Sequence, residues 1–240
     1  MLANGDRLFI ETRDAGNKTA MFSCVEVTSG KWLVEDKIFD EPWWVSLGGA
    51  AGDVLLLTVY TGTDNPDKKS VVAYDVNAHK VLWYRNGFAL SETTSRYVIG
   101  QDTRNPGQFV ALDLFTGNLT SSTESHLADS QNFTVIRPFH YEEATDHFNT
   151  VGNFLQTRMG ISPLRRIEYL ENNGLIIISA FVQESELANY LLVFDDGGQF
   201  LLQEKLGENL KGVALDTFFI FSGHLMFIKD KTELRAYTIL

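Results

Sequence analysis

The chain has 240 residues, of which 44% are hydrophobic and 12% aromatic, with only 5 prolines. It can therefore build a substantial core and is neither disordered nor collagen-like. Its formal net charge of −11 argues against nucleic acid and against anionic membranes as partners, because both favour a basic surface. The single cysteine, Cys24, excludes an intrachain disulfide.

The first residues, MLANGDRLFIETRD, lack the basic segment and apolar stretch of a signal peptide. No run of about 18 apolar residues occurs that could span a membrane. We therefore expect a cytoplasmic protein, unless a leader has been removed from the N-terminus.

Short apolar stretches, interrupted by Gly, Asn, Asp, Ser or Thr, follow one another along the whole chain and are typical of β-strands. The expected strands are residues 7–13, 20–27, 53–61, 70–76, 80–85, 96–102, 109–115, 133–141, 175–182, 190–196, 199–206, 224–230 and 233–240. Helical periodicity is weak and confined to residues 185–189 and 209–216, so we expect no helix of useful length.

A repeat becomes visible where strands end in an acidic residue followed by a turn. The residues at this position are Glu26, Asp75, Asp113 and Asp195. The first three lie roughly 40 to 50 residues apart, and the fourth follows after about twice 40 residues, as for propeller blades. A degenerate unit is therefore expected near Asn153, and a last one near Thr238.

The stretch AYDVNAHKVLW, residues 73–83, shows the repeat most fully. Asp75 is expected to bond backbone amides of the turn, as Asp side chains do. The strand that follows would be the outermost of its blade, and Trp83 would anchor it by burying roughly 150–250 Å². Glu26, Asp75, Trp83, Asp113 and Asp195 are thus predicted to be structural anchors of the repeat.

Ala73, Asp75 and Trp83 match the pattern Ala-x-Asp-x-x-x-Gly-x-x-x-Trp, with His79 in place of the glycine. The stretch therefore resembles the tryptophan-docking repeat of quinoprotein-type β-propellers, and the chain is similar to small bacterial propeller-like proteins of unknown function. The repeat at residues 111–121 keeps Gly117 but has Ser121 where the tryptophan would be. A quinone cofactor is not expected, because the vicinal disulfide of many such enzymes needs a second cysteine. We expect no cofactor.

The predicted fold is all-β, a propeller of about five to six blades, some incomplete, in one domain over residues 1–240. Its two ends are expected to share a blade or to lie in adjoining blades.

The predicted function is a non-catalytic scaffold that binds a protein or a small molecule. One alternative is a carbohydrate-active hydrolase or lyase with a polar site at the channel mouth. A hydrolase needs two carboxylates about 5–10 Å apart, and the candidates are Glu142, Glu143, Asp146 and Glu168. Another alternative is a subunit that docks through unfinished blades.

Residues 140–147 hold the densest group of titratable side chains. His140, Glu142, Glu143 and His147, with Asp146 between them, offer nitrogen and oxygen ligands for a divalent metal. An acidic loop without a metal explains the same residues. Asp64, Asn65 and Asp67 resemble a calcium loop in composition, but the Gly and Glu of an EF-hand are missing.

Candidate ligand-binding residues are Trp43, Trp44 and Arg165. If Trp43 and Trp44 lie on a strand, they face opposite sides, so one enters the core and the other can stack on a sugar or peptide. Arg165 could clamp a carboxylate, but it and Arg166 alternate faces and are expected to pair with surface acids instead. Cys24 lies in an apolar strand, where a structural role is expected.

Overall fold

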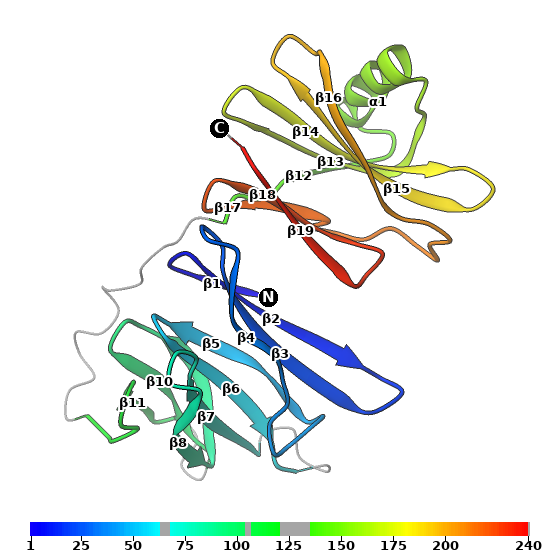
Figure 1. Cartoon of the computed structure of the whole chain (residues 1–240). Helices are drawn as coiled ribbons and strands as arrows, with labels where there is room; N and C mark the ends of the chain where they lie inside the picture. Colours follow the sequence, from blue (N-terminus) through cyan, green and yellow to red (C-terminus); the bar gives the residue numbers. More distant parts are fainter. Residues whose placement is uncertain (63–67, 104–106, 121–134, 240) are drawn as a thin grey trace. The chain divides into compact units, whose positions relative to one another are not determined.

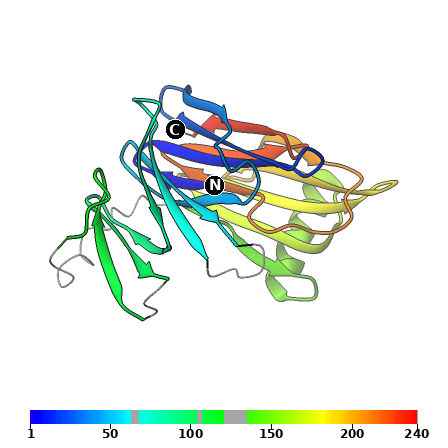
Figure 2. The same ribbon diagram turned by 90° about the horizontal axis from the view of Figure 1, so that it is seen from below.

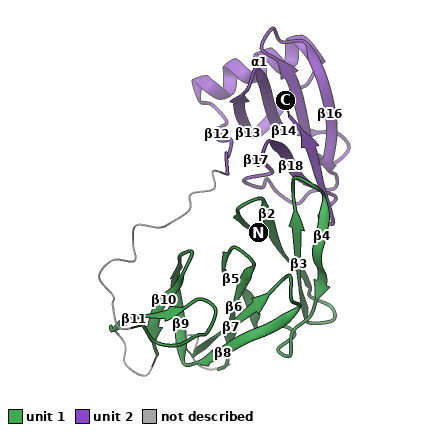
Figure 3. Ribbon diagram, turned by 60° about the vertical axis from the view of Figure 1, so that its left-hand side comes forward, with its two compact units in different colours: residues 1–133 green, residues 134–240 purple. Residues whose placement is uncertain are grey.

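The computed structural model describes residues 1–62, 68–103, 107–120 and 135–239 (Figure 1). The chain divides into two compact units, residues 1–133 and 134–240 (Figure 3). Each unit is described by itself below. The expectation of a single domain over residues 1–240 stays a prediction.

The described residues of unit 1 form three antiparallel sheets, each a meander in which neighbouring strands follow one another in the chain. The first sheet consists of β1 (Leu2–Asn4), β2 (Arg7–Asp14), β3 (Thr19–Glu26) and β4 (Lys31–Lys37). The second consists of β5 (Val45–Ala51), β6 (Val54–Tyr60), β7 (Lys69–Asp75) and β8 (Lys80–Asn86). The third consists of β9 (Phe88–Thr93), β10 (Tyr97–Asp102) and β11 (Phe109–Asp113).

The three sheets of unit 1 pack face to face. Side chains alternate between the two faces of a strand, and both faces of β6 are apolar. Leu55 and Leu57 pack with Phe9 and Phe22 of the first sheet. Leu56 points the other way and packs with residues of the third sheet. The continuous apolar run of β6 therefore reflects a sheet that is covered on both sides.

Within its described part, residues 135–239, unit 2 has two antiparallel sheets and one helix. The larger sheet has the order β12 (Phe139–Glu142), β13 (Pro163–Asn172), β14 (Leu175–Gln183), β15 (Leu187–Asp195) and β16 (Phe200–Gly207). The smaller sheet consists of β17 (Phe218–Phe221), β18 (His224–Lys229) and β19 (Glu233–Thr238). Leu170, Ile177 and Leu191 of the larger sheet form a core with Phe218 and Phe227 of the smaller one.

The helix α1 (Asp146–Met159) covers the other face of the larger sheet (Figures 1 and 2). Its buried residues, Phe148, Val151 and Leu155, follow the helical spacing of three and four residues. Thr145 caps its first turn, and Gly160 ends it in the left-handed conformation with φ of 68°. The expectation of no useful helix is therefore wrong, and so is the blade unit expected near Asn153, which lies on α1.

Most of the predicted strands are present. Residues 185–189 and 209–216, where a weak helical pattern was noted, are not helical, and β15 begins within the first of these ranges. The C-terminal strand β19 pairs with β18, so it does not share a sheet with β1 or β2.

The fold class is all-β, as predicted. Each sheet is an antiparallel meander, and sheets stack face to face within each unit, which is how propeller blades are built. The described residues form five sheets, within the predicted range of five to six blades. Three-stranded sheets correspond to the incomplete blades of the prediction.

Candidate functional site

A groove of about 440 Å³ lies in unit 1, between the segment that follows β4 and the face of the second sheet. We call it the unit 1 groove. The residues that define it are Ile38, Phe39, Tyr74, His79, Val81 and Tyr84. Phe39 forms its inner wall, because its ring lies edge-on to the rings of Phe22 and Tyr74, with centroids 5.7 and 5.1 Å away.

The outer part of the unit 1 groove is apolar and open to solvent. Ile38, Val81 and Tyr84 are 46%, 51% and 54% exposed. Charged groups lie at its rim: Lys37, Asp40 and Glu41 border it, and the Lys37 ammonium sits 5.8 Å from the centre of the Phe39 ring. An apolar surface with a few charges at its border suits a ligand that has an apolar body and a polar end.

Trp43 and Trp44 lie in the connection between β4 and β5 and not on a strand. Glu41 accepts hydrogen bonds from both of their backbone amides, at 3.0 and 2.8 Å. Trp44 is 54% exposed. Trp43 is half-buried and has Arg13 and Lys18 each 5.1 Å from its ring centre. Neither tryptophan enters the core, which corrects the expectation that one does. Stacking of Trp44 on a ligand stays a prediction.

The repeat acids hold their turns by hydrogen bonds. Asp75 accepts from the amides of Asn77 and Ala78 at 2.9 and 2.8 Å. Asp113 accepts from the amide and the hydroxyl of Thr116, both at 2.8 Å. In the other two turns, Ser29 donates to Glu26 and the Gln199 amide donates to Asp195.

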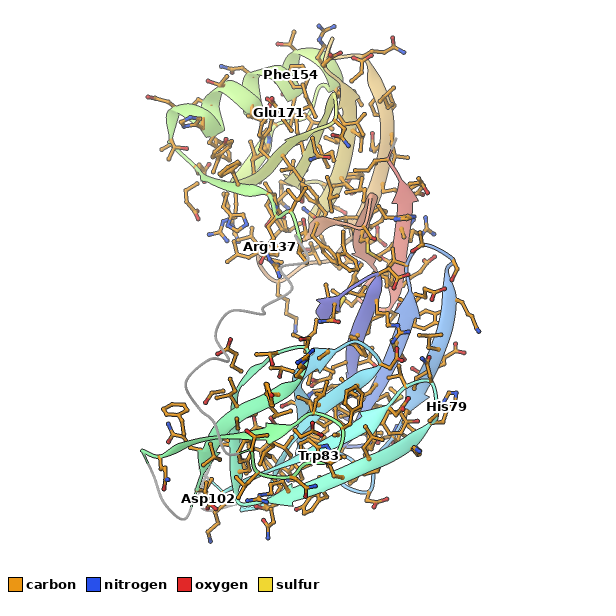
Figure 4. The ribbon with its side chains drawn as sticks, turned by 90° about the vertical axis from the view of Figure 1, so that its left-hand side faces the viewer. His79, Trp83, Asp102, Arg137, Phe154 and Glu171 are labelled. Carbon is orange, nitrogen blue, oxygen red and sulfur yellow. The ribbon has the colours of Figure 1, made fainter. Side chains whose placement is uncertain are left out.

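Trp83 lies on β8, an edge strand of its sheet, and bridges to the third sheet (Figure 4). Its indole N–H donates to the carbonyl of Leu114 at 2.8 Å. A Cβ atom on Gly117 would lie 2.7 Å from the indole ring. The tryptophan of one repeat therefore packs on the glycine turn of the next.

The residue four positions after the acid adopts a left-handed conformation in the first three repeats. The φ angles are 68° at Gly30, 52° at His79 and 69° at Gly117. His79 thus occupies a backbone position that favours glycine, and its imidazole borders the unit 1 groove.

The predicted metal residues at 140–147 do not converge on one point. Glu142 pairs with the Arg166 guanidinium, and its Oε1 accepts from the Arg166 Nε at 2.9 Å. His147 lies in the first turn of α1 and stacks on Tyr141, with ring centroids 4.9 Å apart. Asp146 begins α1, where a negative charge suits the helix dipole. Glu143 lies in the exposed turn before the helix.

His140 belongs to a different cluster, with Glu168 and Asp216. His140 is directly opposite Glu168 in the pairing of β12 with β13. Its Nε2 lies 3.4 Å from Glu168 Oε1 and 3.3 Å from Asp216 Oδ1, and the three ligand atoms lie within 4.8 Å of one another. Asp216 precedes β17 and also pairs with Arg137 at 3.0 Å.

Glu168 is fully buried, and its two oxygens have different surroundings. Oε2 accepts hydrogen bonds from the amide and the hydroxyl of Thr217. The Thr217 hydroxyl is also 2.7 Å from that of Ser179, which is bonded in turn to Asn189. Oε1 has no hydrogen-bond partner among the described residues.

Sequence reasoning named Glu168 only as a possible catalytic carboxylate and did not find Asp216. One signal was available for Glu168: it is in phase with Leu170 on its strand, so the alternation places it at a core position. No local signal marks Asp216, because the fold brings it to Glu168 from 48 residues away.

The other predicted residues are also located. Arg165 is exposed and lies at an irregularity in the pairing of β13, with φ of 64°. Cys24 is buried in the core of unit 1, and this burial raises the pKa of its thiol to about 12, so the thiolate nucleophile is disfavoured. Residues 64, 65 and 67 of the calcium-like loop lie outside the described residues.

Comparison with known proteins finds a family profile described as "Domain of unknown function (DUF4905)", which matches residues 3–83. No curated protein matches the chain. The DUF4905 match covers most of the first two sheets of unit 1, the repeat that ends in Trp83, and the residues that define the unit 1 groove except Tyr84. No helix in the described residues is long and apolar enough to cross a membrane.

Solved structures similar to the chain include the β-propeller domain of the Trilobed protease from Pyrococcus furiosus, with a TM-score of 0.34 and 10% identity over 98% of this chain and 66% of that one. BamB from Moraxella catarrhalis has a TM-score of 0.27 and 12% identity over 94% of this chain and 75% of that one. Pyrococcus horikoshii acylaminoacyl peptidase has a TM-score of 0.31 and 8% identity over 97% of this chain and 36% of that one.

Proposed function

We propose that this protein is a cytoplasmic, non-catalytic binding module, and that unit 1 binds a small molecule or peptide side chain with an apolar body in the unit 1 groove. The observation that carries the proposal is the groove itself. Its volume of about 440 Å³ falls within the range of about 300–1,000 Å³ that is usual for ligand sites. Ligand binding would cover the exposed side chains of Ile38, Val81 and Tyr84, which water now contacts at a free-energy cost.

The charges around the unit 1 groove restrict the class of ligand that the groove can bind. Lys37 supplies a cation beside the apolar wall, whereas Asp40 and Glu41 lie on the segment that borders it. A ligand that carries an anionic group next to an aromatic or aliphatic body can pair with Lys37 while its body covers Val81 and Tyr84. Binding would need no change in the sheets, because strands form the groove floor.

Binding is favoured over the carbohydrate-active alternative by the position of Glu168. Its carboxylate is fully buried, and Thr217 holds one of its oxygens. Glu142, a second carboxylate of that alternative, is paired with Arg166. A substrate ring would have to displace these contacts before either carboxylate could act on it.

The proposal is tested with 8-anilinonaphthalene-1-sulfonate, a fluorescent probe with an apolar body and one negative charge. Val81→Asp places a charge in the unit 1 groove, and Phe109→Asp is its matched control, because both residues are 51% exposed on edge strands of unit 1. We expect saturable binding in the wild type and in Phe109→Asp, with affinity at least tenfold lower in Val81→Asp. Equal affinity in all three folded proteins would remove the groove as the site.

A further inference from the structure

The buried carboxylate of Glu168 has one oxygen without a hydrogen-bond partner among the described residues. Among the residues that the structure describes, Glu168 is the one buried acidic or basic residue. Its Oε2 is satisfied by Thr217, but Oε1 has no hydrogen-bond donor. Buried polar atoms nearly always have a partner, and leaving a charged one without is costly. Oε1 lies 3.4 Å from His140 Nε2 and within 4.8 Å of Asp216 Oδ1.

The separations of two carboxylate oxygens from His140 Nε2 match those of ligands around one ion, and all three atoms lie within 4.8 Å of one another. Nitrogen and oxygen ligands lie about 2.0–2.2 Å from zinc, which places two ligands of a tetrahedral ion about 3.3–3.6 Å apart. The observed separations from His140 Nε2 are 3.4 Å to Glu168 Oε1 and 3.3 Å to Asp216 Oδ1.

A salt bridge through a protonated His140 explains these distances less well. Charge-assisted N–H···O bonds are usually about 2.7–2.9 Å long, and both observed separations are longer. A single Nε2 proton would also have to serve two carboxylates. A divalent cation satisfies both carboxylates at once. It also compensates their two charges, of which only that of Asp216 is paired with an arginine, Arg137, among the described residues.

The ligand set indicates the class of cation. One imidazole nitrogen and two carboxylate oxygens suit zinc or manganese better than calcium or magnesium, which prefer oxygen ligands alone. The His140 and Asp216 side chains are 32% and 38% exposed, so solvent reaches the cluster and can supply a water as the remaining ligand.

We propose that His140, Glu168 and Asp216 bind one divalent transition-metal ion, of the zinc or manganese class, within unit 2. The ion joins β12 and β13 of the larger sheet to the segment that leads into β17 of the smaller one. An isolated bridge between Ile136 and Ile220 already links the same two regions. The site therefore has a structural role, in which the ion ties the two sheets of unit 2 together.

The experiment uses the full chain, treated with EDTA and dialysed, and titrated with Zn²⁺ and separately with Mn²⁺ by calorimetry and thermal melting. We expect one saturable site for at least one of the two ions. At about a hundredfold excess over the dissociation constant, the melting temperature should rise by roughly 5–10 °C.

Three variants locate the site. His140→Gln and Asp216→Asn should weaken binding at least tenfold. Glu168→Gln should abolish the thermal response, and without metal it should melt no lower than the wild type, because its amide can donate where Oε1 has no partner. This metal-free readout separates a cation site from a purely structural carboxylate.

His147→Gln is the matched control, because it removes a histidine of the same segment that does not face Glu168. Wild-type binding by His147→Gln supports the proposal. The proposal is overturned if neither ion binds, or if binding is lost in His147→Gln and kept in His140→Gln.

Discussion

The two units differ in what they bury between sheets. In unit 1 the buried polar residues among those described are Ser23, Thr58, Ser70 and Thr94, all neutral hydroxyl groups. In unit 2 they are Glu168, Ser179 and Asn189, which include a carboxylate and an amide. A hydroxyl is easily satisfied by a nearby carbonyl, whereas a buried carboxylate needs several donors or a cation. Among the described residues, unit 2 therefore buries a charged group, whereas the buried polar residues of unit 1 are neutral.

The units differ also in how closely they follow the repeat. Unit 1 places one acid-and-turn motif in each of its sheets, at Glu26, Asp75 and Asp113. Unit 2 adds strand β12 to the edge of its larger sheet and covers the outer face of that sheet with α1. In Figure 4, Phe154 lies on α1, where its ring packs edge-on to Phe194 of the sheet at 5.0 Å. The helix thus occupies the face on which another sheet would otherwise stack.

The largest effect is expected from the contact between repeats in unit 1. Trp83→Ala should lower the free energy of unfolding by about 3 kcal/mol, at the low end for aromatic truncations, because the ring is only partly buried. The indole hydrogen bond to Leu114 is lost as well. Urea unfolding measures the change. Trp44→Ala, at a 54% exposed position, is the control and should stay within about 0.5 kcal/mol of the wild type. Similar values for the two variants would show that Trp83 anchors nothing.

A double-mutant cycle that combines Gly117→Ala with Trp83→Ala tests the same contact, between the indole ring and the glycine turn. Its Cβ would meet the indole ring at 2.7 Å, so the substitution should cost about 1–3 kcal/mol in the wild type. In the Trp83→Ala background the steric part disappears and only the backbone cost of the left-handed conformation remains. Additive costs would contradict a direct contact between the two residues.

A smaller effect is expected at the start of the helix in unit 2. Thr145 accepts a hydrogen bond from the amide of Phe148 at 3.3 Å, and Thr145→Ala should cost about 1 kcal/mol in the free energy of unfolding. Thr150→Ala, in the middle of α1, removes a hydroxyl without removing a cap. It should be neutral or slightly stabilising, since alanine favours helix. Equal losses in both variants would contradict the capping role.

A substitution in the turn at His79 is expected to raise the free energy of unfolding. His79 has φ of 52°, where glycines stand in the neighbouring repeats. His79→Gly should relieve the strain, offset in part by the larger entropy of glycine in the unfolded chain, for a net stabilisation of at most about 1 kcal/mol. Asn77→Gly, in the same turn but without a positive φ, should destabilise. A loss of stability in His79→Gly would show that its imidazole contributes contacts that outweigh the backbone.

The smallest effect concerns pH. Hydrogen bonds from the hydroxyl and amide of Thr116 hold the pKa of Asp113 below its ordinary value. Because the folded pKa is the lower one, this contribution is complete above the ordinary pKa of about 3.9 and is lost as the pH falls through the folded value. Asp113→Asn should therefore lose less stability than the wild type on acidification below about pH 4 in urea unfolding. If the free energies of unfolding of Asp113→Asn and the wild type fall in parallel as the pH is lowered, the Asp113 carboxylate does not contribute this pH dependence.

The sequence predicts the regular parts of both units because their signals are local. Alternation and turn residues place β7 and β8, and the spacing of the acids predicts the succession of sheets. The helix was missed although Thr145, the spacing of Phe148, Val151 and Leu155, and Gly160 all mark it. This amphipathic pattern is short, and its signal is weak beside the many strand-like stretches of the chain.

The cluster of His140, Glu168 and Asp216 could not be predicted from patterns of residues that are close together in the sequence. His140 was predicted as a ligand, but with neighbours in sequence such as Glu142 and His147, which the fold turns toward other partners. The residues that face it are Glu168 across the strand pair and Asp216 from a distant turn. Long-range pairing determines such clusters, and spacing along the chain contains no information about it.

The most direct test of the account is anomalous diffraction from crystals of the full chain grown with Zn²⁺, with data collected on both sides of the zinc absorption edge. We predict a peak in contact with His140 Nε2, Glu168 Oε1 and Asp216 Oδ1, joining the two sheets of unit 2. A zinc peak among Glu142, Glu143 and His147 would contradict it, and so would the absence from unit 2 of both a zinc peak and, in crystals grown with Mn²⁺, a manganese peak.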